Sequence, residues 1–354
     1  MKDHRLYMDI HAIQTLPPSN VNRDDSGSPK TAQYGGVQRA RVSSQAWKRA
    51  IRRYFADHSG ADLGVRTKRI IDYVAEQILA LDASVGEEAA MNMAEETLNK
   101  AGIKTDKKKR AAKALFFMGK KQAAELAKAA LAGETDKKAL QEILKEEPDI
   151  DIALFGRMVA DDPTLNEDAS AQVAHAISTH AVQTEFDYYT AMDDKSPEDQ
   201  AGAGMLGTIE YNSETLYRYA NVAVHELVRQ LDSKEKAISA LKLFVEAFSN
   251  SMPSGKINTF ANDTLPQALM INIRGDRPVN LVSAYENPVR PHDGYVGESV
   301  RRLFEELKKT EKFVDKPLLT LYLTQDEVSE KPEGQAEDSL RDLLNDLDQL
   351  EDLM

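Results

Sequence analysis

The chain has 354 residues, 42% of them hydrophobic, and its formal net charge is −13 at pH 7. This length and apolar content suffice for one large folded domain with insertions or for two domains. Because the chain lacks cysteine, disulfides, thiolate zinc sites and cysteine nucleophiles are excluded, and no segment approaches the roughly 20 apolar residues that cross a bilayer. We therefore expect a cytoplasmic protein with no signal peptide and no membrane partner.

The N-terminal segment alternates between apolar and polar side chains. From Leu6 to Ile13 this alternation has a period of two, which predicts a half-buried strand. Beyond it, the prolines at 17–18, the aspartates at 24–25 and the glycine pair at 35–36 all interrupt regular structure. A sheet is thus predicted to begin at the N-terminus, followed by a long exposed loop over residues 16–36.

A basic amphipathic helix is predicted after the pair Ser43-Ser44, which is a good N-cap. Between Trp47 and Phe55, apolar residues recur at i, i+3, i+4, i+7 and i+8, which is one face of a helix. The adjoining arc carries four residues that one linear anion could contact together: Gln45, Lys48, Arg49 and Arg52. The helix N-terminus would add free N–H groups and the positive end of its dipole, which favour a phosphate.

The segment from Val37 to Arg53 carries a local charge of +6, since it contains no acidic residue. Its basic residues are Arg39, Arg41, Lys48, Arg49, Arg52 and Arg53. A charged helix face is often only solvated, but solvated faces usually mix both signs. Because the Debye length is only about 8 Å at physiological salt, this segment can attract phosphates despite the negative net charge.

The rest of the chain mixes predicted helices and strands. Residues 66–147 are rich in Ala, Glu, Lys and Leu and predict an insertion of about four helices. Strands are predicted at 151–155, near 173–182, at 216–224 and at 268–273, and the polar segment 183–214 predicts a protruding hairpin or loop. A helical pattern returns at 222–248. This arrangement favours an α+β fold of the ferredoxin or RRM kind.

The C-terminal segment 326–354 holds most of the negative charge. It has eleven acidic residues and two basic ones, a balance of −9, which leaves −4 for the remainder of the chain. Leucines between Leu340 and Leu350 predict a short acidic helix there.

Three groups of residues carry a resemblance to a known family. The first comprises residues 22–25, the glycine pair at 35–36 and residues 39–52; the second comprises 151–158 and 174–180; the third is 217–221. In order and spacing they resemble the CasC family, the backbone subunits of type I-E CRISPR-associated Cascade complexes, within the RAMP superfamily. The similarity covers most of the chain and is least in the helical insertion and the C-terminal tail.

The resemblance implies a right-hand shape and a subunit without catalytic activity or cofactor. The implied parts are an RRM/ferredoxin-like palm at 1–59, 148–183 and 215–325, a helical fingers insertion at 60–147, a thumb β-hairpin at 184–214 and an acidic tail at 326–354. The implied partners are CRISPR RNA, target DNA, further Cascade subunits and other copies of the chain stacked head to tail. Such heterologous stacking would grow as an open helix. Each thumb would displace a guide base at regular intervals.

The resemblance also assigns roles to individual residues. Met158 corresponds to an apolar wedge against the displaced nucleotide, and the fingers residues Lys137 and Lys138 correspond to a pair used against duplex DNA, although Gln141 stands where a further lysine is expected. RNA contacts are expected from Arg23, Ser43, Gln45, Lys48, Arg49 and Arg52, from Arg39 and Arg41 in the same basic segment, and from Gly255 and Lys256 in a second loop.

Three alternatives remain open at this stage. Asp24 and Asp25 are either turn residues or, as in backbone subunits of type III complexes, part of a Mg²⁺-dependent RNase. Tyr217 and Tyr219 could stack on bases, but the RNP consensus is missing and cross-strand packing is favoured. A stand-alone single-strand binder of the RRM class is the third. The histidines His175 and His180 are interpreted as packed or surface residues, since no nearby acid completes a metal site.

Overall fold

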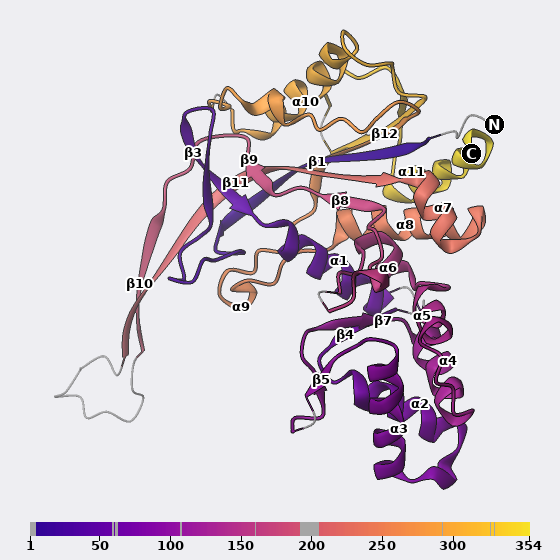
Figure 1. Ribbon diagram of the computed structural model, residues 1–354. Helices are drawn as coiled ribbons and strands as arrows, with labels where there is room; N and C mark the ends of the chain where they lie inside the picture. The colour runs from indigo at the N-terminus through magenta and orange to yellow at the C-terminus, as the bar shows by residue number, and fades with distance from the viewer. Residues whose placement is uncertain are drawn as a thin grey trace, which may run out of the picture.

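The computed structural model describes residues 5–58, 60, 63–106, 108–159, 161–191, 205–291, 293–325, 327–328 and 330–354. It has three parts: a sheet covered by helices, a mainly helical body below it, and a long two-stranded ribbon that extends away from the sheet (Figure 1). We call them the palm, the fingers and the thumb. This arrangement confirms the α+β class. Over these ranges no helix has both the length and the apolar character to span a membrane.

The palm sheet is built on β1 (Tyr7–Ser19), which pairs antiparallel with β11 (Met205–Ala223) and β12 (Pro266–Arg274). Over the described residues it has ten strands; eight follow the order β14-β13-β12-β1-β11-β9-β3-β2, while β8 and β10 pair with β11. The other strands are β2 (Thr31–Tyr34), β3 (Val37–Val42), β8 (Ala171–Val173), β9 (Ala176–Ser178), β10 (Glu185–Ala191), β13 (Leu319–Thr324) and β14 (Gln335–Ala336). The strands predicted around residues 6–13, 173–182, 216–224 and 268–273 are therefore confirmed.

The alternating side chains of β1 enter two separate hydrophobic cores. Met8 and Ile10 pack on one face of the sheet, and Ile13 packs on the other with Tyr217. The first core is closed by α1 (Ser44–His58), α7 (Val224–Leu231) and α8 (Lys234–Asn250), and the second by α10 (Val296–Thr310). Because both faces of the sheet are covered, ligand contacts must come from loops, strand ends and the outer faces of helices.

Two predictions about secondary structure are wrong. Residues 16–36 are not one loop, because β1 continues to Ser19 and β2 forms a hairpin with β3. The turn of this hairpin is Gly35-Gly36, both with positive φ, and a Cβ atom at position 35 would lie 1.7 Å from the carbonyl oxygen of Glu286. Residues 151–155 are not a strand but belong to the helix α6 (Ile150–Phe155), since a short buried apolar run does not distinguish the two.

The fingers have a hydrophobic core of their own, which includes Ile71, Leu98 and Leu126. As predicted, four α-helices lie in the described residues of this part: α2 (Ile70–Leu81), α3 (Glu87–Lys100), α4 (Lys120–Leu131) and α5 (Lys137–Lys145). Two small antiparallel pairs join them, β4 (Val65–Thr67) with β7 (Phe116–Met118) and β5 (Thr105–Asp106) with β6 (Ala111–Ala112). A separate core allows the fingers to project from the palm as a folded unit.

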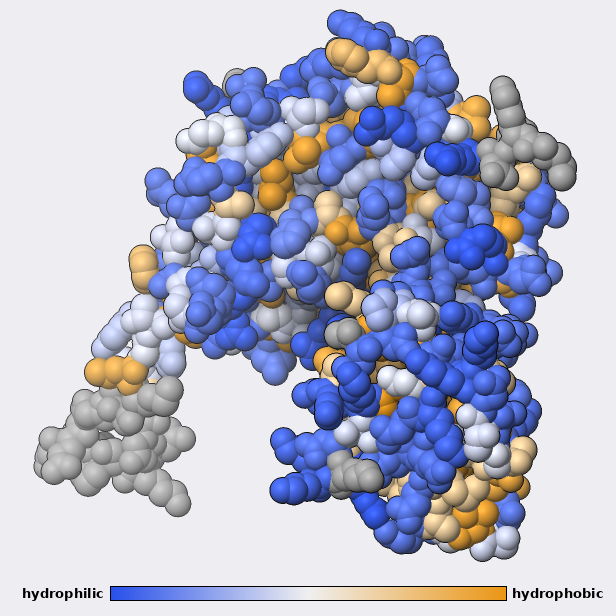
Figure 2. Space-filling view, viewed as in Figure 1, coloured by the Kyte–Doolittle hydropathy of each residue, from blue (hydrophilic) through white to orange (hydrophobic). Residues whose placement is uncertain are grey.

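The thumb is the antiparallel pair of β10 with the first residues of β11, in register from Glu185 opposite Tyr211 to Ala191 opposite Met205. Its described part agrees with the predicted hairpin over 184–214, while residues 192–204 lie outside the described residues. Figure 1 shows the ribbon leaving the palm on the side that also bears the fingers. The space-filling view shows a gap between the described part of the thumb and the fingers (Figure 2), which we call the arch.

The acidic C-terminal segment folds against its own palm. It contains α11 (Leu340–Asp346) and α12 (Leu350–Leu353), joined by a 3₁₀ turn, and confirms the predicted terminal helix. Leu343, Leu347 and Leu350 are fully buried in the same core as α8. Lys242 of α8 also forms an ion pair with Asp348, with 2.7 Å between nitrogen and oxygen.

Candidate nucleic-acid interface

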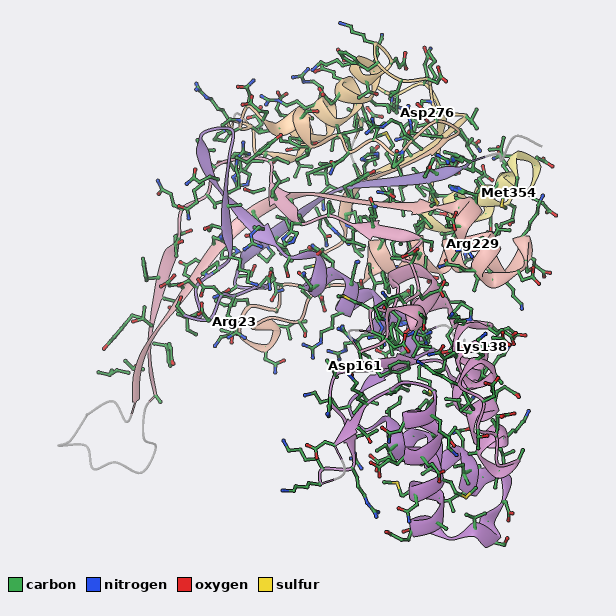
Figure 3. All side chains as sticks on the ribbon, in the orientation of Figure 1. Arg23, Lys138, Asp161, Arg229, Asp276 and Met354 are labelled. Atoms are coloured by element: carbon green, nitrogen blue, oxygen red, sulfur yellow. The ribbon has the colours of Figure 1, made fainter. Side chains whose placement is uncertain are left out.

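A groove of about 770 Å³ opens on the palm between the loop after β1, the outer face of α1 and the loop that follows α8. Arg23, which lines this groove, is labelled in Figure 3 and lies on the lower side of the palm in that view. The groove is lined by polar and charged groups, among them Asn22, Arg23, Asp24, Asp25, Arg49, Arg53, Tyr54, Asp57, His58, Ser254, Gly255 and Asp263. Residues from three distant parts of the sequence therefore meet along one open channel.

Helix α1 forms one wall of the groove. Its buried residues Trp47, Ile51 and Phe55 fix the helix on the palm, so that Arg49 and Arg53, one turn apart, are exposed along the channel. Ser43 is the N-cap: its Oγ accepts from the N–H of Ala46 at 3.3 Å, while its own N–H donates to Asn22 Oδ1 at 2.8 Å. Ser43 is itself buried, so it holds the helix start against the groove loop and offers no free hydroxyl.

The loop before β2 forms the second wall, and Asp24 fixes its shape. Asp24 Oδ1 accepts from Ser26 N (2.9 Å), Ser26 Oγ (2.6 Å) and Ser28 N (3.0 Å), and these bonds, led by the Ser26 hydroxyl, lower the pKa of the Asp24 carboxyl. Asp24 is therefore a turn residue, which leaves the neighbouring Arg23 exposed. In the described part of the chain, no group of three His, Asp or Glu residues is placed to hold a metal ion.

The third wall is the loop before α9 (Ile257–Phe260). A Cβ atom at Gly255 would lie 2.1 Å from the carbonyl oxygen of Val21, so only glycine permits this close approach of the two loops. Lys256 follows in the left-handed region with φ 52° and is half-buried. The two residues expected from the sequence to contact RNA are therefore placed beside the groove, Gly255 by its backbone and Lys256 at the start of α9.

The four residues of the predicted arc on α1 differ in exposure: two are exposed and two are partly buried. Gln45 and Arg49 are exposed, whereas Lys48 is half-buried, with its nitrogen 5.7 Å from the centre of the Phe155 ring, and burial lowers its pKa. The side chain of Arg52 is 27% exposed and forms an ion pair of 3.1 Å with the buried Asp151. Lys48 and Arg52 thus lie toward the base of the fingers, and Arg53 takes the place beside Arg49 along the groove.

Arg53 was absent from the predicted site although its spacing could have identified it. It follows Arg49 by four residues and therefore lies on the same helix face. The prediction chose Arg52 because it lies on the arc next to the apolar stripe. Helical spacing alone does not show that Asp151 and the carbonyl of Gly64 bind Arg52 in the folded chain.

The sequence predicts RNA contacts for Arg39 and Arg41, but in the structure Arg39 is buried and hydrogen-bonded to backbone carbonyls. The guanidinium of Arg39 is fully buried and donates to the carbonyl oxygens of Tyr34, Ser178 and Tyr285 at 2.8–3.1 Å. We remove it from the candidate interface because it has no surface left for a phosphate. Arg41 is half-buried and lies within hydrogen-bonding distance of His175 Nδ1, 3.0 Å away.

The aromatic pair on β11 belongs to the core. Tyr217 and Tyr219 are both buried, and the hydroxyl of Tyr219 donates to Asp9 Oδ1 at 2.7 Å. Burial raises the pKa of Asp9 to about 7. The favoured interpretation, packing within the sheet, is therefore confirmed.

His180 is buried as well: its ring stacks on Tyr295 with centroids 3.6 Å apart, and its Nε2 accepts from Thr215 N.

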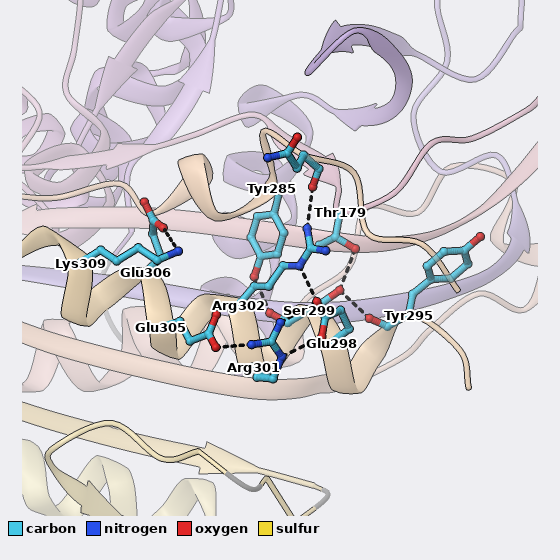
Figure 4. Close-up of polar contacts among 11 residues, drawn as sticks. Thr179, Tyr285, Tyr295, Glu298, Ser299, Arg301, Arg302, Glu305, Glu306 and Lys309 are labelled. Atoms are coloured by element: carbon cyan, nitrogen blue, oxygen red, sulfur yellow. Dashed lines mark hydrogen bonds and ion pairs between the residues drawn. The ribbon is translucent and has the colours of Figure 1, made fainter. Parts of the chain in front are cut away.

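The arginines of α10 also form ion pairs within the protein (Figure 4). Arg301 and Arg302 both bind the carboxylate of Glu298, at 2.8 and 2.7 Å, and Arg302 donates to the carbonyl of Asn287. Ser299 Oγ donates to Thr179 Oγ1 at 2.8 Å, which attaches α10 to the strand edge. This helix therefore supports the sheet and does not present a free basic face.

Met158 and Lys138 are exposed to solvent, whereas Lys137 is held in an ion pair. Met158 is 84% exposed and follows Arg157, whose buried guanidinium donates to the carbonyls of Phe117, Leu144 and Leu165. On α5, Lys138 is exposed, but the Lys137 nitrogen lies 2.9 Å from Asp162 Oδ2, which also accepts from Gln141. The anchored Arg157 holds Met158 in place at the junction of palm and fingers.

Comparisons with known proteins agree with this architecture. The family described as CT1975-like protein matches residues 8–349. A chain of a structure described as a CRISPR RNA-guided surveillance complex, pre-nicking, is 32% identical with a TM-score of 0.86, covering 97% of this chain and 99% of that one. A chain of a second CRISPR RNA-guided surveillance complex is 29% identical with a TM-score of 0.75 and the same coverage. No curated protein sequence matches. The resemblance to Cascade backbone subunits is thereby confirmed.

Proposed function

The chain belongs to the CT1975-like protein family, and we propose that it is a backbone subunit of a type I-E Cascade surveillance complex that binds CRISPR RNA in the palm groove and performs no chemistry. Several copies stack head to tail on one guide, beside the other Cascade subunits, and present the guide for pairing with target DNA in antiviral defence. The guide then supplies sequence specificity, while the protein contacts the sugar-phosphate backbone.

The observation that carries this proposal is the groove in which Arg23, Arg49 and Arg53 meet the loop at Gly255. Guanidinium groups at successive positions of an open channel suit the regular phosphates of an extended strand. Asp25, Asp57 and Asp263 line the same groove and reduce its positive charge. The affinity of one copy is therefore modest, and tight binding comes from many copies linked along one RNA.

Exposed apolar side chains on the thumb favour stacking of copies. Phe186 and Tyr188 project from the same face of β10 and are 66% and 63% exposed, and Met158 is exposed on the palm side. Figure 2 shows apolar surface near the end of the described part of the thumb. Covering such side chains stabilises an assembly by about 25 cal/mol per Å². A thumb that lies over the next copy would cover them, and the contact is heterologous, as an open polymer requires.

The double substitution Arg49→Ala/Arg53→Ala tests the groove. Removing two phosphate contacts should lower the RNA that copurifies with the tagged chain by about tenfold or more, for every guide alike, and make the salt dependence shallower by about 2 in the log–log slope. The matched control is Arg229→Ala/Arg290→Ala, which removes two exposed arginines elsewhere. Unchanged RNA retention would refute the groove as the interface, and a loss that varied with guide sequence would indicate base recognition instead.

A further inference from the structure

One row of side chains on α1 faces the groove and changes in size along the helix. Its members recur at intervals of four residues and all line the groove: Ala46, Ala50, Tyr54 and His58. Because residues four apart share a helix face, this row runs alongside the exposed arginines of the same wall. Small side chains therefore line the first part of the wall, and aromatic side chains line its last part, toward the C-terminal end of α1.

Tyr54 and His58 form a parallel stack, which we call the α1 stack. Their ring centroids lie 4.0 Å apart and their planes differ by 9°. The Tyr54 hydroxyl donates to Glu246 Oε1 at 2.9 Å, and His58 Nδ1 lies within hydrogen-bonding distance of the Tyr54 carbonyl oxygen, 3.1 Å away. Both rings are therefore held in fixed orientations, which lowers the entropic cost of ordering them when a ligand binds.

The α1 stack is attached to the palm core on one side and is exposed on the other. Tyr54 is half-buried and packs against the core that contains Phe244 and Phe248 of α8. His58, which lies over Tyr54, is exposed. The stack therefore presents an aromatic surface, supported by the palm core, within the groove.

The loop that follows α8 adds apolar groups and an unpaired hydroxyl to the groove. Met252 and Pro253 of this loop line the groove. Ser251 lines it as well and is only 6% exposed, and within the described residues its Oγ has no hydrogen-bond partner. A polar atom of a ligand in the groove would satisfy this hydroxyl, whose desolvation is otherwise uncompensated. With a volume of about 770 Å³, the groove is large enough for a nucleotide.

A nucleobase suits this end of the groove better than a further phosphate does. Single-stranded RNA stacks its bases on aromatic side chains, and every base offers a flat π-face for this contact. Asp57 precedes His58 and also lines the groove, and its carboxylate disfavours a phosphate there. Phosphates are attracted instead to Arg49 and Arg53, one turn apart on the neighbouring row. The backbone and the bases of one strand therefore have separate contact sites on α1.

We propose that the α1 stack binds the face of one guide base in each copy, without reading its identity, while Arg49 and Arg53 bind the flanking phosphates. The inference rests on the proposed function and adds a base contact to it. Stacking covers the face of a base and leaves its hydrogen-bonding edge free, so the held base remains able to pair with target DNA. Each copy would thus fix the position of one base as well as neutralise the backbone.

The test measures binding of the full-length chain, by fluorescence anisotropy, to two labelled strands of equal length and charge. One is a mixed-sequence RNA of roughly 12 nucleotides, and the other is an abasic strand with the same number of phosphates. Wild type should bind the RNA about tenfold more tightly than the abasic strand, because only the RNA can stack. His58→Ala should lose this preference but keep its affinity for the abasic strand and its salt dependence, since no phosphate contact is removed. His58→Phe, which keeps an aromatic face, should retain the preference.

The matched control is Phe313→Ala, because the Phe313 side chain is 91% exposed and does not line the groove. This variant should bind both strands as wild type does. Equal affinity of wild type for the two strands would refute the base contact and leave the groove as a phosphate site, whereas failure to bind either strand would refute the proposed function as well. An equal loss for both strands in His58→Ala, or a loss that also occurs in His58→Phe, would overturn the proposal. An unchanged preference for RNA in His58→Ala, with weaker association of copies, would assign the ring to a contact between proteins.

Discussion

Replacing Glu214 with Gln should remove a large pH dependence from the stability of the palm. Glu214 lies on β11 at the base of the thumb, opposite Leu16 of β1, and is only 4% exposed. Within the described residues its Oε2 has no hydrogen-bond partner. Burial raises the pKa of this carboxyl from 4.5 to about 8. Because alternate residues of a strand share a face, Glu214 lies on the same side of β11 as Leu216. Leu216 belongs to the hydrophobic cluster that includes Val21, which lines the groove.

The magnitude follows from linkage between protonation and folding. The folded state keeps the proton that the unfolded chain loses above pH 4.5, so stability is greatest below the unfolded pKa and is lost as pH rises toward the folded pKa. One pKa unit corresponds to about 1.4 kcal/mol, so the loss reaches about 3 kcal/mol by pH 7 and about 5 kcal/mol above pH 8. Glutamine does not titrate, and the variant should lack this slope.

Urea unfolding at several pH values, followed by fluorescence, measures this difference. Trp47 is the only tryptophan and is buried in the palm beside Arg218, so its emission reports on this region. The difference in unfolding free energy between Glu214→Gln and wild type should grow by about 3 kcal/mol from pH 4.5 to 7. Glu210→Gln, a half-exposed position on the same strand, is the control. Parallel pH profiles for Glu214→Gln and wild type would refute the reasoning.

Two further changes probe the turn glycines and the Asp24 loop. Gly35→Ala should lower the melting temperature well beyond Gly36→Ala, because both positions have positive φ but only a Cβ at 35 meets a backbone oxygen, at 1.7 Å; equal shifts would contradict the assigned turn. Incubating the assembled complex with complementary RNA and Mg²⁺ should leave that RNA intact, since Asp24 is committed to its turn. Cleavage that Asp24→Ala abolished would establish the RNase alternative.

Much of the fold could be predicted because local signals agreed with tertiary packing. Alternation in β1, the Ser43 cap and apolar face of α1, and the leucine spacing of the C-terminal helix each identified an element that the structure contains. In each case one face of the element is buried, and that burial is what the periodicity records. The strand prediction for residues 151–155 failed because a short run with four buried residues fits a strand and a helical turn equally well.

The site could be predicted only in part, because tertiary partners decide which charges stay free. Sequence patterns located the basic segment, but Arg39 lies on an inner strand where three carbonyls bind it. Arg52 is likewise bound by Asp151, about a hundred residues later in the chain.

The most direct test of the central claim is a structure of the assembled complex with its RNA, determined by electron cryo-microscopy. The account predicts a sugar-phosphate backbone in the palm groove, with phosphates beside Arg49 and Arg53 and against the loop at Gly255. A map in which the RNA passes elsewhere and this groove opens onto bulk solvent would contradict it.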